Sequence, residues 1–401
     1  MKVILLTGEP FPNGMAATNR IKCYVRAIKE GGLDCEVIIF RRTEVYGKRP
    51  NNTEGQGSFN GIPYRFIGGT PLRGSNVLIR KMNDLFDIRR TEIYLKNNLA
   101  KGDILFFYTG GGGYVKLMLR LMAVAKKNKA FCIRDFCELP YGTGSETYNN
   151  RRFRKITLEH QLSKLDGIIS ISDSLLTLAQ KYTQATCKHI KVPIMVDFSK
   201  YYMPDNSEQA EYPYIFHSGT LYQQKDGILG MIEAFGIALN KTKAPVKFIS
   251  TGDINKSPHK NELNALIAQY HLEDKIIFTG YISDDKLKDY LSKAQMVIIN
   301  KYRTQQNNYC FSTKLGEYLA AAKPVVITNV GEAMNWLENG KSAYVVEPED
   351  TKVLADAIVY VFAHPEESRQ IGIAGQEVCR QCFDYRNWSM PLVEFMNQLG
   401  K

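Results

Sequence analysis

The chain has 401 residues, 44% of them hydrophobic, which is enough for two domains of middle size that each bury a core. No apolar run approaches the roughly 18 residues of a membrane-spanning helix, which excludes a protein with transmembrane helices. The formal net charge of +11 favours acidic partners such as nucleotide phosphates or an anionic membrane surface. The charge excess is diffuse and no nucleic-acid-binding module is recognisable, so nucleic acid is not an expected partner.

The start of the chain and its cysteines both bear on location. The apolar stretch within residues 1–8 is too short for a signal peptide and ends at a turn residue, so it predicts a first buried strand. The eight cysteines stand mostly among apolar residues, which is typical of a reducing compartment. Cys379 and Cys382 form a CxxC pair without a second ligand pair nearby, which favours a coincidence of helix spacing over a metal or redox site. We therefore expect a cytoplasmic protein.

Short β-branched runs alternate with helical patterns through the first half of the chain. This alternation is typical of a parallel sheet with helices on both faces. Residues 43–62 are rich in glycine, asparagine and charge, and are predicted to form a mobile loop. The predicted strands are 2–7, 35–41, 63–67, 103–109, 130–135 and 167–171, and the helical patterns include 17–31 and 114–128.

A second α/β series follows a polar segment, residues 199–213, which loses apolar periodicity and is the candidate linker. The sequence therefore predicts an α/β fold of two Rossmann-like, doubly wound domains that face a central cleft, with ligands at the carboxyl ends of the strands. The predicted strands are 214–218, 246–251, 275–279, 296–300, 324–328 and 343–346, and the predicted helices are 228–241, 260–271, 284–294, 313–322 and 351–363. The predicted parts are a first domain over 1–200, a second over 210–380, and a C-terminal helix within 381–401 that crosses back to the first domain.

The most informative segment is 309–331, where a helix is predicted to begin at a Ser-Thr pair. Ser312 and Thr313 stand at the N-cap, and a helix start offers N–H groups and a partial positive charge that suit a diphosphate. Lys314 adds a full charge there. Glu317, about one turn further, can accept two hydrogen bonds from a ribose diol. An ordinary capped amphipathic helix is the alternative.

The segment resembles the donor-binding signature of the family 4 glycosyltransferases, the retaining enzymes of GT-B fold, and in particular the type that builds bacterial surface polysaccharides. The resemblance implies that the first domain lies on the acceptor side and that the second binds the nucleotide-sugar donor. It implies no further cofactor. The matching motifs occur in chain order at 165–172, 192–197, 216–221, 224–227, 248–252, 277–281, 337–340 and 345–350.

The resemblance also implies roles for single residues. The turn at Gly219 and Thr220, followed by Lys225, is similar to the element that grips the donor diphosphate, and Gly252 is similar to the glycine of the next loop. Two positions depart from the family pattern. Tyr309 stands where the first glutamate of a Glu-x7-Glu pair is common, and Thr220 stands where many members have an arginine. The second departure leaves more of the diphosphate charge to Lys225 and the helix start.

The first half contains two glycine-containing loops that follow predicted strands. Residues 8–18 resemble the family's first glycine loop, in which Gly14 would permit close backbone approach to the donor phosphate and the acceptor. Residues 109–113 lack the spacing of a dinucleotide-binding fingerprint. Two interpretations of that run remain: it lines the acceptor cleft, or it is a plain turn.

Two carboxylates end a predicted strand of the first half. Asp135 and Glu138 stand near a point where many family members carry a histidine, whereas the first histidine here is His160. Either carboxylate is a candidate catalytic residue that orients the acceptor hydroxyl or the sugar, and capping of the following turn is the alternative. No Asp-x-Asp flanked by apolar residues occurs, so no metal is expected. Lys225 is the candidate for stabilising the leaving group.

The resemblance implies a metal-independent transfer, with retention, from a nucleotide diphosphate sugar to a saccharide or lipid-linked acceptor. The alternatives are an inverting GT-B transferase, a nucleotide-sugar epimerase, or a non-catalytic nucleotide-sugar-binding subunit. Residues 73–97 combine basic and apolar side chains, which makes an anionic membrane surface a further candidate partner and a peripheral position on the inner face of the membrane a candidate location. A solvated basic helix face is the alternative.

Overall fold

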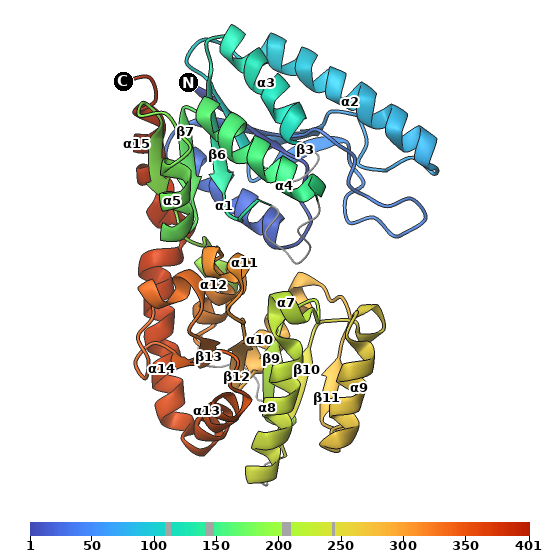
Figure 1. Ribbon diagram of the computed structural model, residues 1–401, viewed down its shortest axis with the longest axis vertical. Helices are drawn as coiled ribbons and strands as arrows, with labels where there is room; N and C mark the ends of the chain where they lie inside the picture. The colour runs from blue at the N-terminus through green and yellow to red at the C-terminus, as the bar shows by residue number, and fades with distance from the viewer. Residues whose placement is uncertain (109–113, 141–147, 203–209, 243–244) are drawn as a thin grey trace. The chain divides into compact units, whose positions relative to one another are not determined.

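The computed structural model describes residues 1–108, 114–140, 148–202, 210–242 and 245–401. The chain forms two compact units, each built of one sheet and its helices (Figure 1). Unit 1 comprises Met1–Met195 and Tyr385–Lys401, and unit 2 comprises Val196–Asp384. Within the described ranges, no helix has both the length and the apolar character that are needed to cross a membrane.

The described residues of unit 1 form an eight-stranded sheet in the order β3-β4-β2-β1-β5-β6-β7-β8. Neighbouring strands are parallel except β3 and β4, which form an antiparallel pair at one edge. Strands β1 and β5 are central and buried, which explains their continuous apolar runs. The strands are β1 Lys2–Thr7, β2 Asp34–Ile39, β3 Gln56–Phe59, β4 Ile62–Phe66, β5 Ile104–Tyr108, β6 Phe131–Phe136, β7 Gly167–Ser170 and β8 Lys188–Lys191.

The core of unit 1 combines segments from both ends of the chain. Leu392 and Phe395 of the last helix are buried in the same cluster as Ile21 and Tyr24 of the first helix. The segment after Asp384 therefore belongs to unit 1. The helices of this unit are α1 Ala16–Glu30, α2 Val77–Asn98, α3 Val115–Lys127, α4 Tyr148–Lys155, α5 Asp173–Gln180 and α15 Ser389–Asn397, with short helical turns at Ile156–Gln161, Leu162–Lys164 and Tyr385–Trp388.

The prediction of a loop over 43–62 is wrong for residues 56–62, which form a hairpin. Strand β3 lies within it and pairs with β4 through a turn at Asn60 and Gly61. These two residues have φ angles of +50° and +77°, which asparagine and glycine adopt readily in a two-residue hairpin turn. Earlier in the stretch, Asn52 is buried and donates a hydrogen bond to Glu44 Oε1 at 2.7 Å. The Asn-Gly pair was the local signal for this hairpin.

Unit 2 has a fully parallel, six-stranded sheet in the order β11-β10-β9-β12-β13-β14 within its described residues. Its strands and the five predicted helices agree with the expected ranges to within two residues at each end. The strands are β9 Tyr214–His217, β10 Lys247–Ser250, β11 Ile276–Phe278, β12 Met296–Ile299, β13 Val325–Thr328 and β14 Tyr344–Val346. The helices are α6 Phe198–Tyr201, α7 Gln223–Asp226, α8 Ile228–Lys241, α9 Lys260–Gln269, α10 Asp284–Lys293, α11 Gln305–Tyr309, α12 Thr313–Ala320, α13 Thr351–Ala363 and α14 Pro365–Val378. Short helical turns lie at Ile254–Lys256, Gly331–Asn335 and Cys379–Phe383.

The junction between α7 and α8 depends on a glycine. Gly227 has a φ of +63°, and a Cβ atom there would lie 2.1 Å from the carbonyl oxygen of Asn300, directly after β12. The Asn300 side chain also donates to Gly227 O at 2.8 Å. This close approach ties the start of α8 to the carboxyl end of β12.

We expect Gly227→Ala to destabilise unit 2 by about 3 kcal/mol or more, because a left-handed conformation and a backbone clash act together. Gly280→Ala is the matched control: Gly280 has a φ of +69° but open space around its Cβ position, so about 1 kcal/mol is expected. Urea unfolding, followed by Trp336 fluorescence in a Trp388→Phe background, measures both effects because the chain has two tryptophans. Equal losses in the two variants would contradict the close approach.

Candidate functional site

The turn after β9 is held by two neighbouring segments of unit 2. The amide of Gly219 donates to Thr251 Oγ1 at 3.0 Å, in the loop after β10. The amide of Ser218 donates to the hydroxyl of Tyr318 on α12 at 2.7 Å. Since parallel strands end at the same edge of the sheet, the turn, the β10 loop and α12 meet at the carboxyl edge of unit 2.

Asp226 is the polar centre of this edge. Its carboxylate is 7% exposed and accepts hydrogen bonds from the amide and the hydroxyl of Thr220, each at 3.0 Å. It also forms an ion pair with the ammonium group of Lys314. Burial alone would raise the pKa of Asp226, but the charges of Lys314 and His217 and the hydrogen bonds outweigh burial and hold it well below its usual value. Asp226 is therefore a buried anion that orders the predicted glycine turn.

Three lysines lie around this anion. Lys225 precedes it on α7, Lys314 pairs with it, and Lys301 donates from Nζ to the carbonyl oxygen of Lys225 at 3.2 Å. Burial lowers the pKa of Lys301, and the charge of Lys314 lowers it further. Lys301 was not among the predicted site residues, although its place directly after a predicted buried strand was a signal. The cluster carries more positive charge than Asp226 neutralises, so it suits an anionic ligand.

Helix α12 begins beside the lysine cluster. It starts at Thr313 with Ser312 as its N-cap, as predicted. The Ser312 side chain makes no capping hydrogen bond to the helix, and both residues are half-buried. The hydroxyl of Ser312 and the start of the helix are therefore available to an anion next to Lys314.

Glu317 lies on α12 and is held by a residue that was not among the predicted site residues. The hydroxyl of Tyr201 on α6 donates to Glu317 Oε1 at 3.1 Å. Tyr201 is 2% exposed, whereas Glu317 is half-buried. Nothing in the local sequence around Tyr201, at the start of the predicted linker, signals this contact. Tyr309 ends α11 and is half-buried, three residues before Ser312.

Two predicted glycines stand where a side chain would clash. A Cβ atom at Gly219 would lie 2.3 Å from Nε2 of His217, and one at Gly252 would lie 2.0 Å from Cγ of Leu221. The loops after β9 and β10 are thus packed directly against each other. The predicted roles of Gly219, Thr220, Lys225, Gly252, Ser312, Thr313, Lys314 and Glu317 stay predictions, and the structure places all eight residues in unit 2.

Gly14 lies in a loop of unit 1 that is tied down by polar side chains. A Cβ atom at Gly14 would lie 2.0 Å from Oγ1 of Thr18, whose hydroxyl donates to the carbonyl oxygen of Pro10 at 2.6 Å. The neighbouring Asn13 exchanges two hydrogen bonds with Asn52. The loop between β1 and α1 therefore has a fixed backbone, as a binding loop requires. The glycine run at 109–113 lies outside the described residues.

Asp135 is buried inside unit 1. It is 2% exposed, receives hydrogen bonds from Nε and Nη2 of Arg20 at 3.1 Å each, and accepts one from the hydroxyl of Tyr24 at 2.6 Å. Arg20 also donates to the carbonyl oxygen of Pro193 at 2.7 Å. This geometry favours a structural role for Asp135 over the predicted contact with an acceptor. Its catalytic role stays a prediction.

Glu138 and Glu9 form a different pair of carboxylates at the carboxyl edge of the unit 1 sheet. Glu138 is exposed after β6, and Glu9 is half-buried after β1. Burial raises the pKa of Glu9, the charge of Arg41 opposes this, and the charge of Glu138 adds to it. Glu9 therefore holds a proton more readily than an ordinary glutamate. Glu9 lies in the predicted first glycine loop but was not a predicted site residue.

The cysteines and carboxylates form no recognisable metal centre in the described part of the chain. All eight cysteines are free thiols, and the thiol of Cys379 donates to the carbonyl oxygen of Gly316 at 3.4 Å. Among the described residues, no group of three or more His, Cys, Asp and Glu side chains is placed to hold a metal ion.

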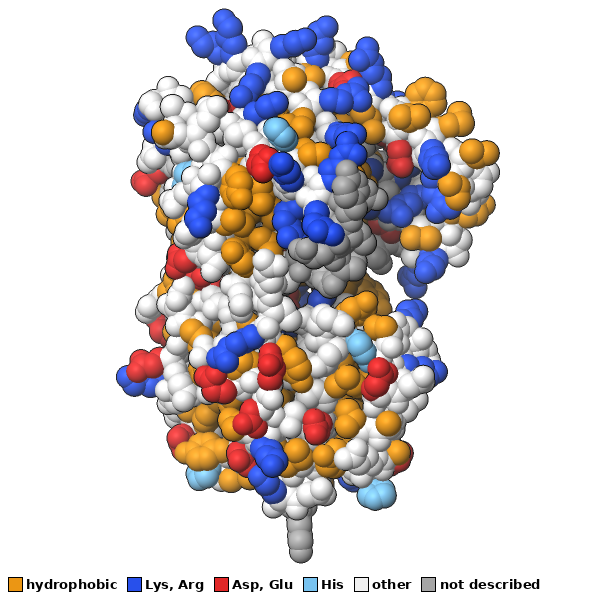
Figure 2. Space-filling model, in the orientation of Figure 1, with side chains coloured by type: hydrophobic (Ala, Val, Ile, Leu, Met, Phe, Trp, Pro, Cys, Tyr) orange, Lys and Arg blue, Asp and Glu red, His pale blue; other side chains and the backbone are white. Residues whose placement is uncertain are grey.

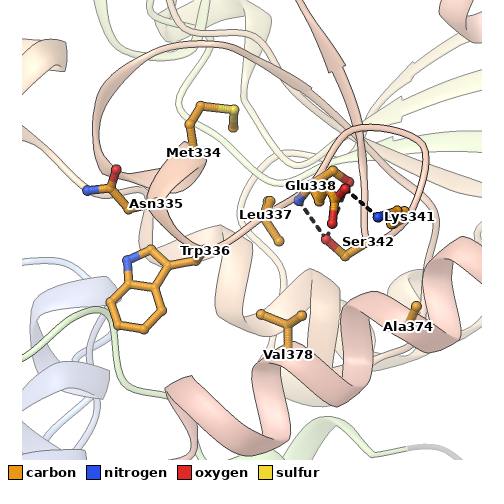
Figure 3. Close-up of a pocket in the computed structure, with 9 residues that line it drawn as sticks. All are labelled: Met334, Asn335, Trp336, Leu337, Glu338, Lys341, Ser342, Ala374 and Val378. Atoms are coloured by element: carbon orange, nitrogen blue, oxygen red, sulfur yellow. Dashed lines mark hydrogen bonds and ion pairs between the residues drawn. The ribbon is translucent and has the colours of Figure 1, made fainter.

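A pocket of about 430 Å³ lies elsewhere in unit 2, between residues 334–342 and α14. Figure 3 shows Trp336 at one end and the pair of Glu338 and Lys341 at the other. Lys341 Nζ lies 2.5 Å from Glu338 Oε1. None of the predicted site residues lines the pocket, so we assign it no part in the site at the sheet edge.

Comparisons with known proteins agree with this architecture. Residues 200–378 match the family model described as glycosyl transferases group 1. Mannosylfructose-phosphate synthase of Agrobacterium fabrum is 21% identical over 168 residues, which cover 41% of this chain and 36% of that protein. The chain spans about a third to a half of the length of the curated relatives it matches.

Solved structures match over the whole chain. A sucrose-phosphate synthase from Thermosynechococcus elongatus has a TM-score of 0.74 at 17% identity and covers 100% of this chain and 99% of its own. Anabaena Alr3699/HepE, solved with UDP and glucose, has a TM-score of 0.71 at 15% identity and covers 98% and 99%. These structures confirm the expected GT-B fold class, and the family match over residues 200–378 confirms the resemblance to glycosyltransferases.

The buried His217 makes the stability of unit 2 depend on pH. Its Nδ1 lies 3.1 Å from the carbonyl oxygen of Ile298, and burial followed by the charge of Lys314 lowers its pKa to about 4. The unfolded chain binds a proton near pH 6.5, so unit 2 should lose stability as the pH falls from about 6.5 to about 4. The expected loss reaches about 3 kcal/mol. Urea unfolding of the Trp388→Phe chain at several pH values measures the slope.

His217→Asn keeps a donor near the position of Nδ1 but does not titrate, so it should flatten the curve between these pH values. His271→Asn, an exposed position of the same unit, is the matched control and should leave the slope unchanged. A wild-type curve that is already flat from pH 6.5 to 4 would contradict the buried neutral imidazole.

Proposed function

We propose that this chain, whose residues 200–378 match the family model of the glycosyl transferases group 1, transfers a sugar from a nucleotide diphosphate sugar to a hydroxyl of a saccharide or lipid-linked acceptor. The transfer retains the configuration at the anomeric carbon and uses no bound metal ion. The observation that carries the proposal is the convergence of Lys225, Lys301 and Lys314 with the start of α12 at the carboxyl edge of unit 2.

The lysine cluster suits the diphosphate of the donor. When the bond between the anomeric carbon and the β-phosphate oxygen breaks, negative charge develops on that oxygen. Cations that are fixed before the reaction stabilise this charge without reorganising. Lys225 and Lys301 would supply the positive charge directly. Asp226 holds Lys314 and the turn at Thr220 in place. This supply of positive charge is the reason to propose catalysis without a metal ion.

In the proposed reaction, the acceptor hydroxyl attacks the anomeric carbon on the face that the diphosphate leaves. The bond from the acceptor oxygen to carbon forms as the bond to phosphate breaks, and the departing phosphate oxygen takes the acceptor proton. No pair of catalytic carboxylates at glycosidase spacing is needed. The free nucleoside diphosphate and the glycosylated acceptor are the products.

Glu317 would bind the ribose of the donor. Its carboxylate can accept hydrogen bonds from the 2′ and 3′ hydroxyls, and the hydroxyl of Tyr201 orients it. One structural neighbour was solved with UDP-glucose, so UDP-linked sugars are the first donors to test.

Unit 1 would supply the acceptor side. Glu138 is exposed at its sheet edge, and Glu9, whose pKa burial raises, lies near it, so this pair is the better candidate for contact with sugar hydroxyls than the buried Asp135. The eight free thiols suit the proposed cytoplasmic location. Nucleic acid has no part in this proposal.

A turnover assay tests the function. Purified protein is incubated with nucleotide sugars and saccharide or lipid-linked acceptors, and released nucleoside diphosphate is measured with and without excess chelator. Release that persists in chelator, and a product with the anomeric configuration of the donor, are expected. An inverted product would favour the inverting transferase, and nucleotide binding without any release would favour a binding subunit.

Lys225→Ala should lower kcat by about 100-fold while changing donor affinity much less, because its charge matters most when the leaving group forms. Lys352→Ala, an exposed position at the start of α13, is the matched control and should leave both unchanged. Steady-state kinetics and nucleotide binding measured side by side separate the two effects. Weaker donor binding with normal kcat would mean that Lys225 binds substrate and transition state alike.

Glu317→Ala should weaken nucleoside diphosphate binding by about 1.5–3 kcal/mol, the scale of hydrogen bonds to a charged group. Tyr201→Phe should cost less, about 1 kcal/mol, since it keeps the carboxylate and removes the hydroxyl that orients it. Glu273→Ala, exposed in the same unit, is the control. Calorimetry with the nucleoside diphosphate and its 2′,3′-dideoxy analogue decides: if Glu317→Ala discriminates against the analogue as strongly as wild type does, the ribose assignment is wrong.

A further inference from the structure

Helix α2 of unit 1 turns apolar side chains towards solvent. Leu78, Met82, Leu85 and Phe86 are 74%, 56%, 68% and 57% exposed. Their spacing of four, seven and eight residues from Leu78 places them on one face of the helix. Figure 2 shows hydrophobic and basic side chains next to each other over the segment labelled α2 in Figure 1. A group of this size on one helix face is an uncommon feature of a surface that meets only water.

The face of α2 opposite these apolar side chains carries a buried acid. Asp87 is fully buried and pairs with Arg42 at 3.2 Å and with Arg90 of the same helix at 3.1 Å. Further along the helix, Glu92 is 8% exposed and pairs with Arg120 of α3 at 2.6 Å. The pairs with Arg42 and Arg120, which lie outside α2, fix the rotation of the helix on the unit. The helix therefore cannot turn to bury its apolar face without breaking them.

The charge around the apolar face is strongly positive. The exposed basic residues of α2 outnumber its one exposed acid, Asp84; they are Arg80, Lys81, Arg89, Arg90 and Lys96. Unit 1 as a whole contains 33 Lys and Arg against 17 Asp and Glu, a formal charge of +16. Unit 2 contains 19 against 24, a formal charge of −5. The positive charge of the protein is thus concentrated on the unit that carries the apolar face.

We propose that this face of α2 binds an anionic membrane surface, with the helix lying in the plane of the interface. Apolar side chains enter the boundary of the acyl chains while lysine and arginine meet anionic headgroups. A second copy of the chain is a poor occupant, because two units of +16 would repel each other. Another polyanion would satisfy the charges but would leave the apolar side chains without a partner. The inference does not depend on the transfer reaction.

Co-sedimentation with lipid vesicles tests the proposal on the full chain. Vesicles of phosphatidylcholine with phosphatidylglycerol should bind the protein at low salt, and pure phosphatidylcholine vesicles or high salt should weaken binding at least tenfold. The double variant with Leu78→Gln and Leu85→Gln should bind at least tenfold more weakly than wild type. The matched control with Val353→Gln and Ile373→Gln, at exposed positions of unit 2, should bind like wild type.

A variant with fewer lysines tests the electrostatic part of membrane binding independently. Lys81→Gln and Lys96→Gln together should reduce binding to anionic vesicles by roughly fivefold for each lysine. Unchanged melting of each variant shows that the fold is kept, and the lysine variant still tests the proposal if the leucine variant does not fold. Equal binding of wild type and both variants, or no binding to anionic vesicles at low salt, would overturn it. A wild-type dimer in analytical ultracentrifugation that the leucine variant makes monomeric would assign the face to a second copy instead.

Discussion

The carboxyl edge of the unit 2 sheet depends on the ion pair and hydrogen bonds of the buried Asp226 carboxylate. A buried anion is unfavourable unless charged and hydrogen-bonding partners surround it. Here the partners come from separate parts of the chain: Thr220 after β9 and Lys314 on α12. Because the left-handed Gly227 follows Asp226, the carboxylate sits where the chain turns from α7 into α8. One buried charge thus fixes the relative positions of a turn, two helices and a lysine.

The parts of unit 2 that could be predicted are those with a local signal. Buried parallel strands form continuous apolar runs, and Ser312 marks the start of α12 by its residue type alone. Lys301 and Tyr201 could not be assigned in this way, because their roles come from contacts with Lys225 and Glu317. These partners are distant in sequence, and one sequence does not show which of many lysines and tyrosines will meet them.

Unit 1 shows the opposite limit of sequence reasoning. Asp135 follows the pattern of a catalytic carboxylate at a strand end, and its carboxylate accepts three hydrogen bonds from Arg20 and Tyr24. The sequence could not show this, because α1 brings both partners to Asp135 from more than a hundred residues away. The hairpin turn at Asn60 and Gly61 was not predicted, although its signal is local. The surrounding stretch is rich in glycine, asparagine and charge, and this composition indicated a loop.

The return of the chain to unit 1 after Asp384 has a consequence for synthesis on the ribosome. Leu392, Phe395 and Met396 belong to the unit 1 core, and the 189 residues of unit 2 precede them in the chain. At cellular rates of elongation, roughly 10–40 s separate the two parts of that core. Unit 2 can therefore fold on the nascent chain while unit 1 still has an open apolar side. The first unit to be translated is the last to be completed, and chaperones have that interval in which to bind it.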